Sequence, residues 1–334
     1  MSRLGDTLFF ETPVHVQTWA AAVGTKEGQG PLGKCFDHVT RDNRFGKKTW
    51  EQAESRMVEL ACEAALSKAD LTLSRIDCAL GGDLLNQCIS TGFAARGLGL
   101  PYLGLYGACS TMAESLILGS AMVSGGFAGR TLCMASSHFC SAERQYRYPL
   151  EYGGQRPPTA QWTATACGAA VLQGEKTAVC IRAATPGRVY DPGITDSSNM
   201  GAAMAQSAYE TLRTFFRDSG TEPQNYSLIV TGDLASIGHG VVRELFRRDG
   251  VELGDRYQDC GVLLYDQSQD VHAGGSGCGC SAAVLCGRIL PDLAAGKLNK
   301  VLFCGTGAMM SPTSANQGES IPGICHLVCL EGGL

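Results

Sequence analysis

Cys109 lies where an apolar stretch gives way to small residues and then to a helix-like segment. The stretch reads Tyr-Leu-Gly-Leu-Tyr-Gly-Ala-Cys-Ser-Thr-Met-Ala-Glu-Ser-Leu over residues 102–116. This order predicts a strand, a sharp turn with Cys109 at its tip, and a helix that begins at the thiol. Ser110 and Thr111 are favoured at helix starts, and Glu114 suits a first turn. Because a helix N-terminus favours negative charge and so eases ionisation of a thiol, Cys109 is placed as the nucleophile of an acyl transfer would be.

The segments around Cys109 follow an order that recurs later in the chain. A helix is predicted over 50–69 from apolar residues at helical spacing, and a strand over 76–80 leads into Gly-Asp-Leu. A second helix over 200–218 and a second strand over 227–231 lead into the same Gly-Asp-Leu. Further pieces match in the same order: cysteine turns at 108–110 and 279–281, strands at 131–135 and 301–304, and closing strands at 166–173 and 324–331.

This order predicts two related α/β halves, residues 1–174 and 175–334. Because strands alternate with helices, we expect mostly parallel sheets covered by helices. The aspartates at the matching strand exits, Asp83 and Asp233, are expected to cap the helices that follow them. Residues 138–165 have no counterpart in the second half and are rich in Arg, Tyr, Gln, Pro and Gly. We interpret them as a long ordered loop insertion, a kind of segment that often carries function.

The predicted loop holds side chains that suit a flat, anionic ligand. Guanidinium groups can bind carboxylates in bidentate fashion, and aromatic side chains can stack on a planar ring. The candidates are Arg144, Arg147 and Arg156 for the carboxylates, His138 as a hydrogen-bond partner, and Tyr146, Tyr148, Tyr152 and Trp162 for the ring. The alternatives are ion pairs of the arginines with Glu143 and Glu151, packing of the aromatic residues within the loop or at a dimer contact, and a core histidine at position 138.

Composition limits the classes of protein that the chain can represent. Its 334 residues carry a net charge of −5, which does not indicate a basic surface for binding nucleic acid. A content of 44% apolar and 18% charged residues indicates a large buried core. Many of the 16 cysteines lie inside apolar segments, and the N-terminus does not resemble a signal peptide, so we expect a reducing, cytoplasmic location. No apolar run reaches the ~18 residues of a spanning helix, so membrane association is expected to be peripheral.

Metal and nucleotide motifs are not found in the sequence. Cys278 and Cys280 do not have the spacing of common structural zinc sites, and no paired Cys or His motif accompanies them. The sequence contains no P-loop and no dinucleotide fingerprint. We therefore expect no metal site and no resident cofactor.

Two duplicated halves with a cysteine on a strand–helix turn in the first resemble the thiolase superfamily over the full chain. A narrower resemblance is to the SpoVAD family of spore proteins. It rests on five segments: Ser-Ser-His at 136–138, Ala-Glu-Arg-Gln-Tyr-Arg-Tyr-Pro at 142–149, Glu-Tyr-Gly-Gly at 151–154, Thr-Gly-Asp-Leu at 231–234 and the glycine-rich 274–282. The resemblance implies a thiolase-like fold, a layered αβαβα sandwich, in a homodimer.

The superfamily resemblance also implies which residues should assist Cys109. Condensing enzymes of this superfamily use a His and an Asn, and Asp233 and Gly279 stand near those positions here. A carboxylate cannot donate to an oxyanion and disfavours a nearby thiolate. Thiolases use a different His and a second Cys, and His272 and Cys304 lie near those places, although the His spacing is one residue short and the Pro is missing. We therefore expect a non-enzymatic protein with a relic pocket; the alternative is a thiolase or ketoacyl synthase-like acyltransferase that uses Cys109 and acyl-CoA.

The SpoVAD resemblance implies a dipicolinic acid-binding component of the SpoVA apparatus. Such a protein acts in uptake of dipicolinate, usually as its calcium chelate, into the forespore and in its release at germination. The implied partners are other SpoVA proteins at the spore inner membrane, and calcium is expected only as an ion carried with the ligand. The expected ligand-binding residues are Cys109, His138, Arg144, Arg147, Trp162, His272 and Gly277.

Overall fold

Strands from both ends of the chain meet in one mixed sheet. The computed structural model describes residues 1–146 and 156–333, and twelve strands of these residues belong to that sheet. Its main path runs through β11 (Tyr257–Asp259), β10 (Leu228–Thr231), β13 (Lys300–Ala308), β14 (Gly323–Gly332), β9 (Val179–Thr185), β2 (Thr7–Val23), β8 (Ala166–Gln173), β6 (Arg130–Ser137), β4 (Cys78–Gly82) and β5 (Tyr102–Gly104). The short β1 (Ser2–Leu4) and β3 (His38–Val39) pair with β2.

The strand order is the same on the two sides of the β2–β9 pair. From the outer edge inward, β5-β4-β6-β8-β2 matches β11-β10-β13-β14-β9. On each side the first two pairs are parallel and the next two are antiparallel. The expectation of mostly parallel sheets is therefore wrong, because the closing strands β8 and β14 run back against their neighbours. β8 is buried along its whole length and β14 over residues 327–330, so their apolar runs carry no signal of strand direction.

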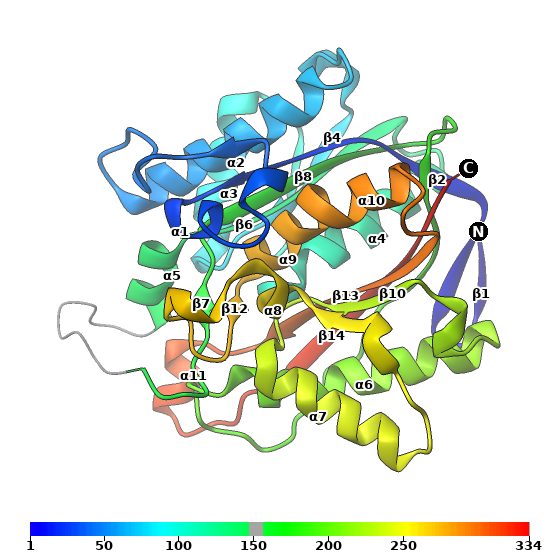
Figure 1. Ribbon diagram of the computed structural model, residues 1–334. Helices are drawn as coiled ribbons and strands as arrows, with labels where there is room; N and C mark the ends of the chain where they lie inside the picture. The colour runs from blue at the N-terminus through cyan, green and yellow to red at the C-terminus, as the bar shows by residue number, and fades with distance from the viewer. Residues whose placement is uncertain (147–155, 334) are drawn as a thin grey trace.

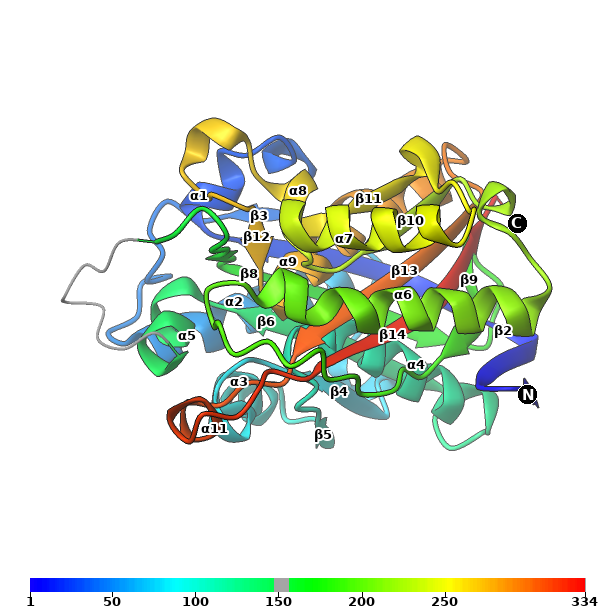
Figure 2. The same ribbon diagram turned by 90° about the horizontal axis from the view of Figure 1, so that it is seen from below.

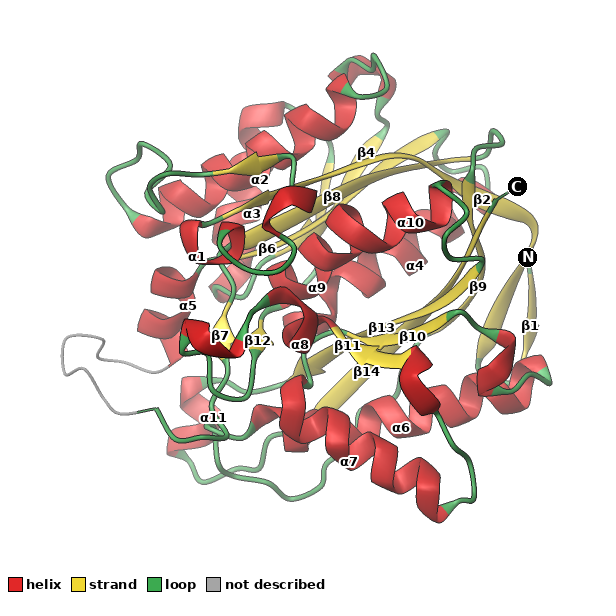
Figure 3. Ribbon diagram, viewed as in Figure 1, coloured by secondary structure: helices red, strands yellow, loops and turns green. Residues whose placement is uncertain are grey.

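Helices form three layers around the two sides of the sheet (Figure 1). The central layer lies between the two sides of the sheet and consists of α4 (Thr111–Ser124), α9 (Cys278–Val284) and α10 (Leu290–Ala294). The outer layers are α2 (Trp50–Ser67) with α3 (Ile89–Leu98) on one side and α6 (Met200–Ser219) with α7 (Ala235–Arg248) on the other (Figure 3). This layered arrangement confirms the predicted αβαβα sandwich.

Local sequence signals account for the long outer helices. Thr49 caps α2 by accepting a hydrogen bond from the Gln52 amide at 3.3 Å. Apolar residues of α2 at helical spacing, such as Met57 and Ala61, are fully buried under the sheet. Helix α6 similarly covers the interval predicted for it, within one residue at its C-terminal end.

The predicted long loop contains regular structure. Helix α5 (Phe139–Tyr146) opens it, and β7 (Trp162–Thr163) near its end pairs with β12 (Gly275–Ser276) in a separate ribbon. The interpretation of 138–165 as a loop throughout is therefore wrong, because Ala142 and Tyr146 lie four residues apart on a helix face packed against the core.

The remaining short helices are α1 (Thr25–Gly28), α8 (Cys260–Leu264) and α11 (Pro312–Asn316). Over the ranges that the structure describes, none of the helices combines the length and the apolar character needed to cross a bilayer.

Candidate functional site

Cys109 occupies the tip of a tight turn, as predicted. The chain leaves β5, forms a short 3-10 turn over Ala108–Ser110 and enters α4 at Thr111. Ala108 has a φ of +51°, a left-handed conformation that a residue with a side chain adopts at a cost in free energy. The hydroxyls of Ser110 and Thr111 donate to the carbonyls of Gly107 and Ala108, at 2.6 and 2.8 Å, rather than capping amides of α4. These bonds hold the thiol at the start of the central helix.

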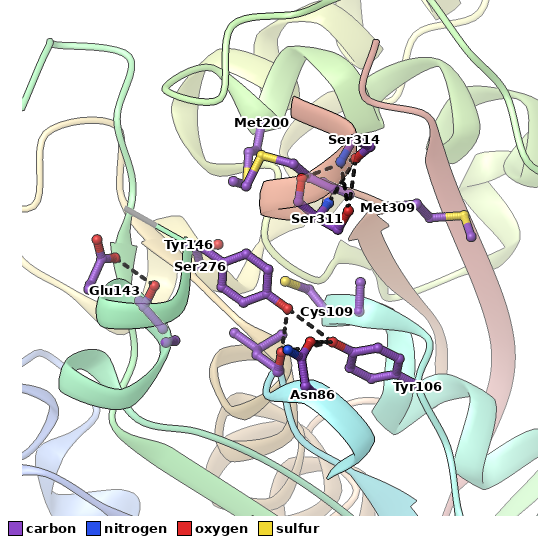
Figure 4. Close-up of a pocket in the computed structure, with 16 residues that line it drawn as sticks. Asn86, Tyr106, Cys109, Glu143, Tyr146, Met200, Ser276, Met309, Ser311 and Ser314 are labelled. Atoms are coloured by element: carbon purple, nitrogen blue, oxygen red, sulfur yellow. Dashed lines mark hydrogen bonds between the residues drawn. The ribbon is translucent and has the colours of Figure 1, made fainter. Parts of the chain in front are cut away.

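The thiol borders a cavity of about 290 Å³ (Figure 4). Tyr106, Asn86 and Tyr146 lie on one side of Cys109, and Met309 with Ser311 on the other. The complete lining is Leu84, Asn86, Tyr106, Ala108, Cys109, Ala142, Glu143, Tyr146, Thr163, Met200, Ser276, Ala308, Met309, Met310, Ser311 and Ser314. The described part of this wall is thus apolar, aromatic and hydroxylic, with one carboxyl group and no cationic side chain.

Asp233 is the charged neighbour of the Cys109 thiol. Its buried carboxyl group accepts hydrogen bonds from the Gly277 amide at 2.9 Å, the Ser276 hydroxyl at 3.1 Å and the Thr306 hydroxyl at 2.8 Å. This carboxyl group is close enough to the Cys109 thiol to affect its ionisation. Burial first, and then the negative charge of Asp233, raise the pKa of Cys109 well above its ordinary value. The pair therefore keeps the sulfur protonated, which is the opposite of what a nucleophile needs.

The matching aspartates of the two halves have different roles. Asp83 accepts from the amides of Leu85 and Thr91, both at 2.8 Å, and so holds the start of α3 as expected. Asp233 makes no such bond to α7. Asp259 at the end of β11 accepts from the amide of Ala235 at 2.9 Å instead. The expectation that Asp233 caps the following helix is therefore wrong: the neighbouring strand supplies the cap and leaves Asp233 turned toward Cys109.

The position expected for the asparagine of condensing enzymes has no room for a side chain. A Cβ atom built on Gly279 would lie 2.1 Å from the Ala166 carbonyl oxygen and 2.7 Å from the Ser137 amide nitrogen. Gly277, two residues earlier in the same turn, has a φ of +100° and donates its amide to Asp233. This turn therefore contributes backbone groups to the site and no oxyanion-binding side chain.

One predicted ligand residue, His138, and one candidate catalytic residue, Cys304, belong to the structural core. His138 is buried; its Nε2 lies 2.8 Å from the Asn43 carbonyl oxygen, and its Nδ1 accepts from the Cys140 amide at 3.2 Å. Burial lowers the pKa of His138, which keeps the ring neutral. Cys304 is buried with Cys325 in the core under α6 and α7, on the other face of β13 from Cys109. Neither side chain is part of the cavity wall.

The other predicted ligand residues lie at the surface around the cavity. Arg144 forms an ion pair with Glu51. His272 is hydrogen-bonded to the Pro157 carbonyl and to Asp270, at 2.8 and 3.1 Å. Trp162 stacks on Phe139, and none of Arg144, His272 and Trp162 is a lining residue. Arg147, Tyr148 and Tyr152 lie outside the described residues. Of the six predicted ligand residues that the structure describes, only Cys109 lines the cavity with its side chain.

A buried carboxyl group fixes the cavity wall that α5 provides. Glu54 of α2 accepts hydrogen bonds from the hydroxyls of Ser90, Ser136 and Ser141, at 3.2, 3.0 and 2.9 Å. Burial, together with the nearby Asp83, raises the pKa of Glu54 to about 8. Because Ser141 precedes the lining residues of α5, Glu54 ties that wall to the outer helix.

Most of the cavity wall gave no signal in the sequence. Tyr146 was identified as a ring-binding candidate, and its hydroxyl donates to the Leu84 carbonyl and lies 3.3 Å from that of Tyr106. Asn86, Tyr106 and Met309 were not identified. Each follows the carboxyl end of a strand. That position in the sequence could have identified them, because the carboxyl ends of parallel strands gather at one edge of a sheet.

Comparison with known proteins gives one sequence family and one structural class. Residues 5–331 match the family of stage V sporulation protein AD (SpoVAD). The chain is 46% identical over 326 residues to stage V sporulation protein AD of Bacillus subtilis (strain 168), covering 98% of this chain and 96% of that protein. The structure resembles 3-oxoacyl-[acyl-carrier-protein] synthase III from Aquifex aeolicus VF5, with a TM-score of 0.57, 14% identity and coverage of 95% and 99% of the two chains. It also resembles a variant of OleA from Xanthomonas campestris, with a TM-score of 0.63, 14% identity and coverage of 97% and 99%. At these identities the structural neighbours establish the fold alone.

Proposed function

The chain belongs to the stage V sporulation protein AD family, and from this membership we propose that it is a non-enzymatic, dipicolinic acid-binding component of the SpoVA apparatus. In this role it acts in uptake of dipicolinate into the forespore and in its release at germination. The ligand site is the cavity beside Cys109.

The contact between Asp233 and Cys109 is the observation that carries the non-enzymatic part of the proposal. A thiol beside a buried carboxyl group stays protonated, and the Gly279 backbone leaves no space for the side chain that would bind an oxyanion. The thiol that enzymes of this fold use as a nucleophile is here a protonated group beside Asp233 in the wall of a pocket. Binding is the remaining use of such a pocket.

The cavity suits a small aromatic ligand. A volume of about 290 Å³ is at the lower end of ligand pockets, which fits a single ring with short substituents. Tyr106 and Tyr146 offer ring faces, and the hydroxyls of Ser276, Ser311 and Ser314 are available to carboxylate oxygens. Because the described lining has Glu143 and no cation, calcium carried with the ligand would supply the positive charge that a dianion needs there.

Titration calorimetry with dipicolinate, with and without calcium, tests this proposal. The parent protein is expected to bind, and Tyr106→Ala is expected to bind more weakly because it removes one ring face. Arg144→Gln is the matched control, since its guanidinium lies outside the cavity and pairs with Glu51. No heat of binding at millimolar ligand, or equal affinities for the parent and Tyr106→Ala, would contradict the proposed site.

The second candidate function is an acyl transfer from acyl-CoA to Cys109. The position of the thiol at the start of α4, open to the cavity, favours it. An acyl-CoA turnover assay that compares the parent with Cys109→Ala separates the two functions. Equal background rates for the parent and Cys109→Ala would contradict an acyltransferase activity at Cys109.

The edge strand β5 is the proposed dimer contact. Leu103 on β5 and Tyr106 just after it are about half exposed, and Phe93 on α3 is exposed beside them. We propose that two copies join across this edge and that the assembly meets other SpoVA proteins at the spore inner membrane, on the cytoplasmic side. Light scattering after size exclusion should give a dimer for the parent and a monomer for Leu103→Lys. A parent protein that runs as a monomer would contradict this interface.

A further inference from the structure

A group of charged and aromatic side chains lies behind the cavity, on the other face of the β7–β12 ribbon. It consists of Lys26 on α1, Arg156, Trp162 and Asp270, and we call it the Trp162 cluster. Side chains alternate along a strand, so Thr163 faces the cavity while Trp162 faces away from it. In Figures 1 and 2, α1 lies on the opposite side of this ribbon from α11, which contributes to the cavity wall. The Trp162 cluster is therefore separate from the site beside Cys109.

Two cations meet at the indole ring of Trp162. The Lys26 Nζ lies 4.0 Å and the Arg156 Cζ 4.9 Å from the ring centroid. Phe139 stacks on the same ring at 3.9 Å and fixes its orientation. The two cations are close enough that Arg156 helps to lower the pKa of Lys26, after the larger effect of burial. Such a pair of like charges needs a negative partner.

Among the residues that the structure describes, the cluster leaves one positive charge without a partner. Arg156 donates through Nη2 to the carboxylate and the carbonyl of Asp270, at 2.7 and 2.8 Å, and Asp270 also contacts His272. The Arg156 Nη1 atom is buried and has no acceptor among the described residues. Within residues 1–146 and 156–333, Lys26 forms no ion pair, although it is half-buried. Lysine and arginine are seldom removed from water without such partners.

The neighbouring acid does not provide the missing charge. Glu27 is fully buried below the cluster, where it accepts from the Tyr265 hydroxyl and the Thr165 amide. Burial raises the pKa of Glu27, which favours its neutral form. Two cations against the single carboxylate of Asp270 therefore leave a net charge of +1 over the described part of the cluster.

We propose that the Trp162 cluster binds one carboxylate group of a small organic acid, held between the Lys26 ammonium and the Arg156 Nη1. A carboxylate carries the single negative charge that the cluster lacks, and its two oxygens match the two free donors. A phosphate dianion would leave the cluster with excess negative charge. The site is independent of the proposed function, because it shares no side chain with the cavity.

Tryptophan fluorescence during a titration with sodium acetate tests the proposal, with sodium chloride keeping the ionic strength constant. The parent should show a saturable change that chloride alone does not give. Lys26→Gln and Arg156→Gln should each weaken acetate binding about tenfold or more, the usual effect of losing a charge-assisted hydrogen bond. Lys34→Gln, which removes an exposed lysine nearby, is the matched control and should behave as the parent does.

Two further variants make the outcome unambiguous. Trp162→Phe should remove the fluorescence change, which assigns the signal to this ring. Tyr146→Phe alters the cavity and should leave acetate binding unchanged, so failure of the cavity proposal and failure of this one are distinguishable. If Arg156→Gln does not fold, Lys26→Gln decides, because the Lys26 ammonium makes no hydrogen bond to the described residues. Absence of a saturable acetate response in the parent, or equal affinities in Lys26→Gln and the parent, would overturn the proposal.

Discussion

Replacing Asp233 by Asn should make Cys109 more reactive. The negative charge of the nearby Asp233 carboxyl group is the second cause, after burial, of the raised pKa of Cys109. Asn retains an oxygen for the Gly277 amide and can place its amide group toward the Thr306 hydroxyl, which can rotate to accept. The variant is therefore expected to fold, with a loss of about 1–3 kcal/mol for the poorer hydrogen bonds.

The size of the effect follows from the charge that is removed. Two unit charges about 4 Å apart interact by about 4 kcal/mol at an effective dielectric constant of about 20. Burial raises the pKa of Asp233, so the carboxyl group is charged only part of the time and the loss is smaller. An effect between about 1.4 and 4 kcal/mol corresponds to a rise of about tenfold to several hundredfold in the thiolate fraction. Because burial persists in the variant, the pKa of Cys109 stays above its ordinary value.

Iodoacetamide labelling at pH 8, followed by peptide mass spectrometry, measures this change. The rate at Cys109 should rise at least about tenfold in Asp233→Asn, in proportion to the thiolate fraction. Cys140, which is half-buried and lies on α5, serves as an internal standard in the same sample. Asp83→Asn is the matched control, since Asp83 is a buried carboxyl in the same sequence context that holds α3 instead. An unchanged Cys109 rate in folded Asp233→Asn would refute the reasoning, because burial alone would then set the state of the thiol.

Three further predictions follow from the packing around the site. Gly279→Asn should destabilise the protein by about 3 kcal/mol or more in urea unfolding, since its Cβ would lie 2.1 Å from the Ala166 carbonyl oxygen; a neutral effect would mean that the turn can move. The pKa of Glu54 is raised from 4.5 to about 8, so the folded state holds a proton that the unfolded state loses, and stability should fall between pH 4.5 and about 8. Glu54→Gln should flatten this dependence by up to about 1.4 kcal/mol per pH unit, and an unchanged slope would contradict a protonated Glu54. Tyr146→Phe should lower stability by about 1 kcal/mol in thermal unfolding, because it loses the bond to the Leu84 carbonyl; equal midpoints would show that this bond contributes nothing.

The prediction of His138 as a ligand residue illustrates what sequence patterns leave open. A histidine at a strand end next to a polar segment can face a pocket or the core, and the residues beside it in sequence are the same in both cases. Asn43, which accepts from the ring, lies in a loop far away in the chain. That partner exists only when the loop after β3 packs against the end of β6, so no local pattern could have identified it.

By itself, the sequence determined the features that depend on neighbours in the chain. Apolar spacing and the Thr49 cap specify α2, and the small residues before Cys109 specify the turn that presents the thiol. Recurrence of these local signals also predicted two related halves, and the strand order is the same on the two sides of the β2–β9 pair. These features are predictable because hydrogen bonds within a helix or turn join residues a few positions apart.

Only the tertiary structure decided what surrounds the thiol. Asp233, Ser276 and Tyr146 reach Cys109 from three separate parts of the chain, and they meet because the two sides of the sheet pack on the same central helices. The same packing turns Trp162 away from the cavity and toward Lys26. Direction of a side chain depends on strand pairing and layer contacts, and a one-residue change in register would reverse it. The sequence placed a cysteine at a helix start, and the long-range contact with Asp233 made it a protonated thiol in a pocket wall.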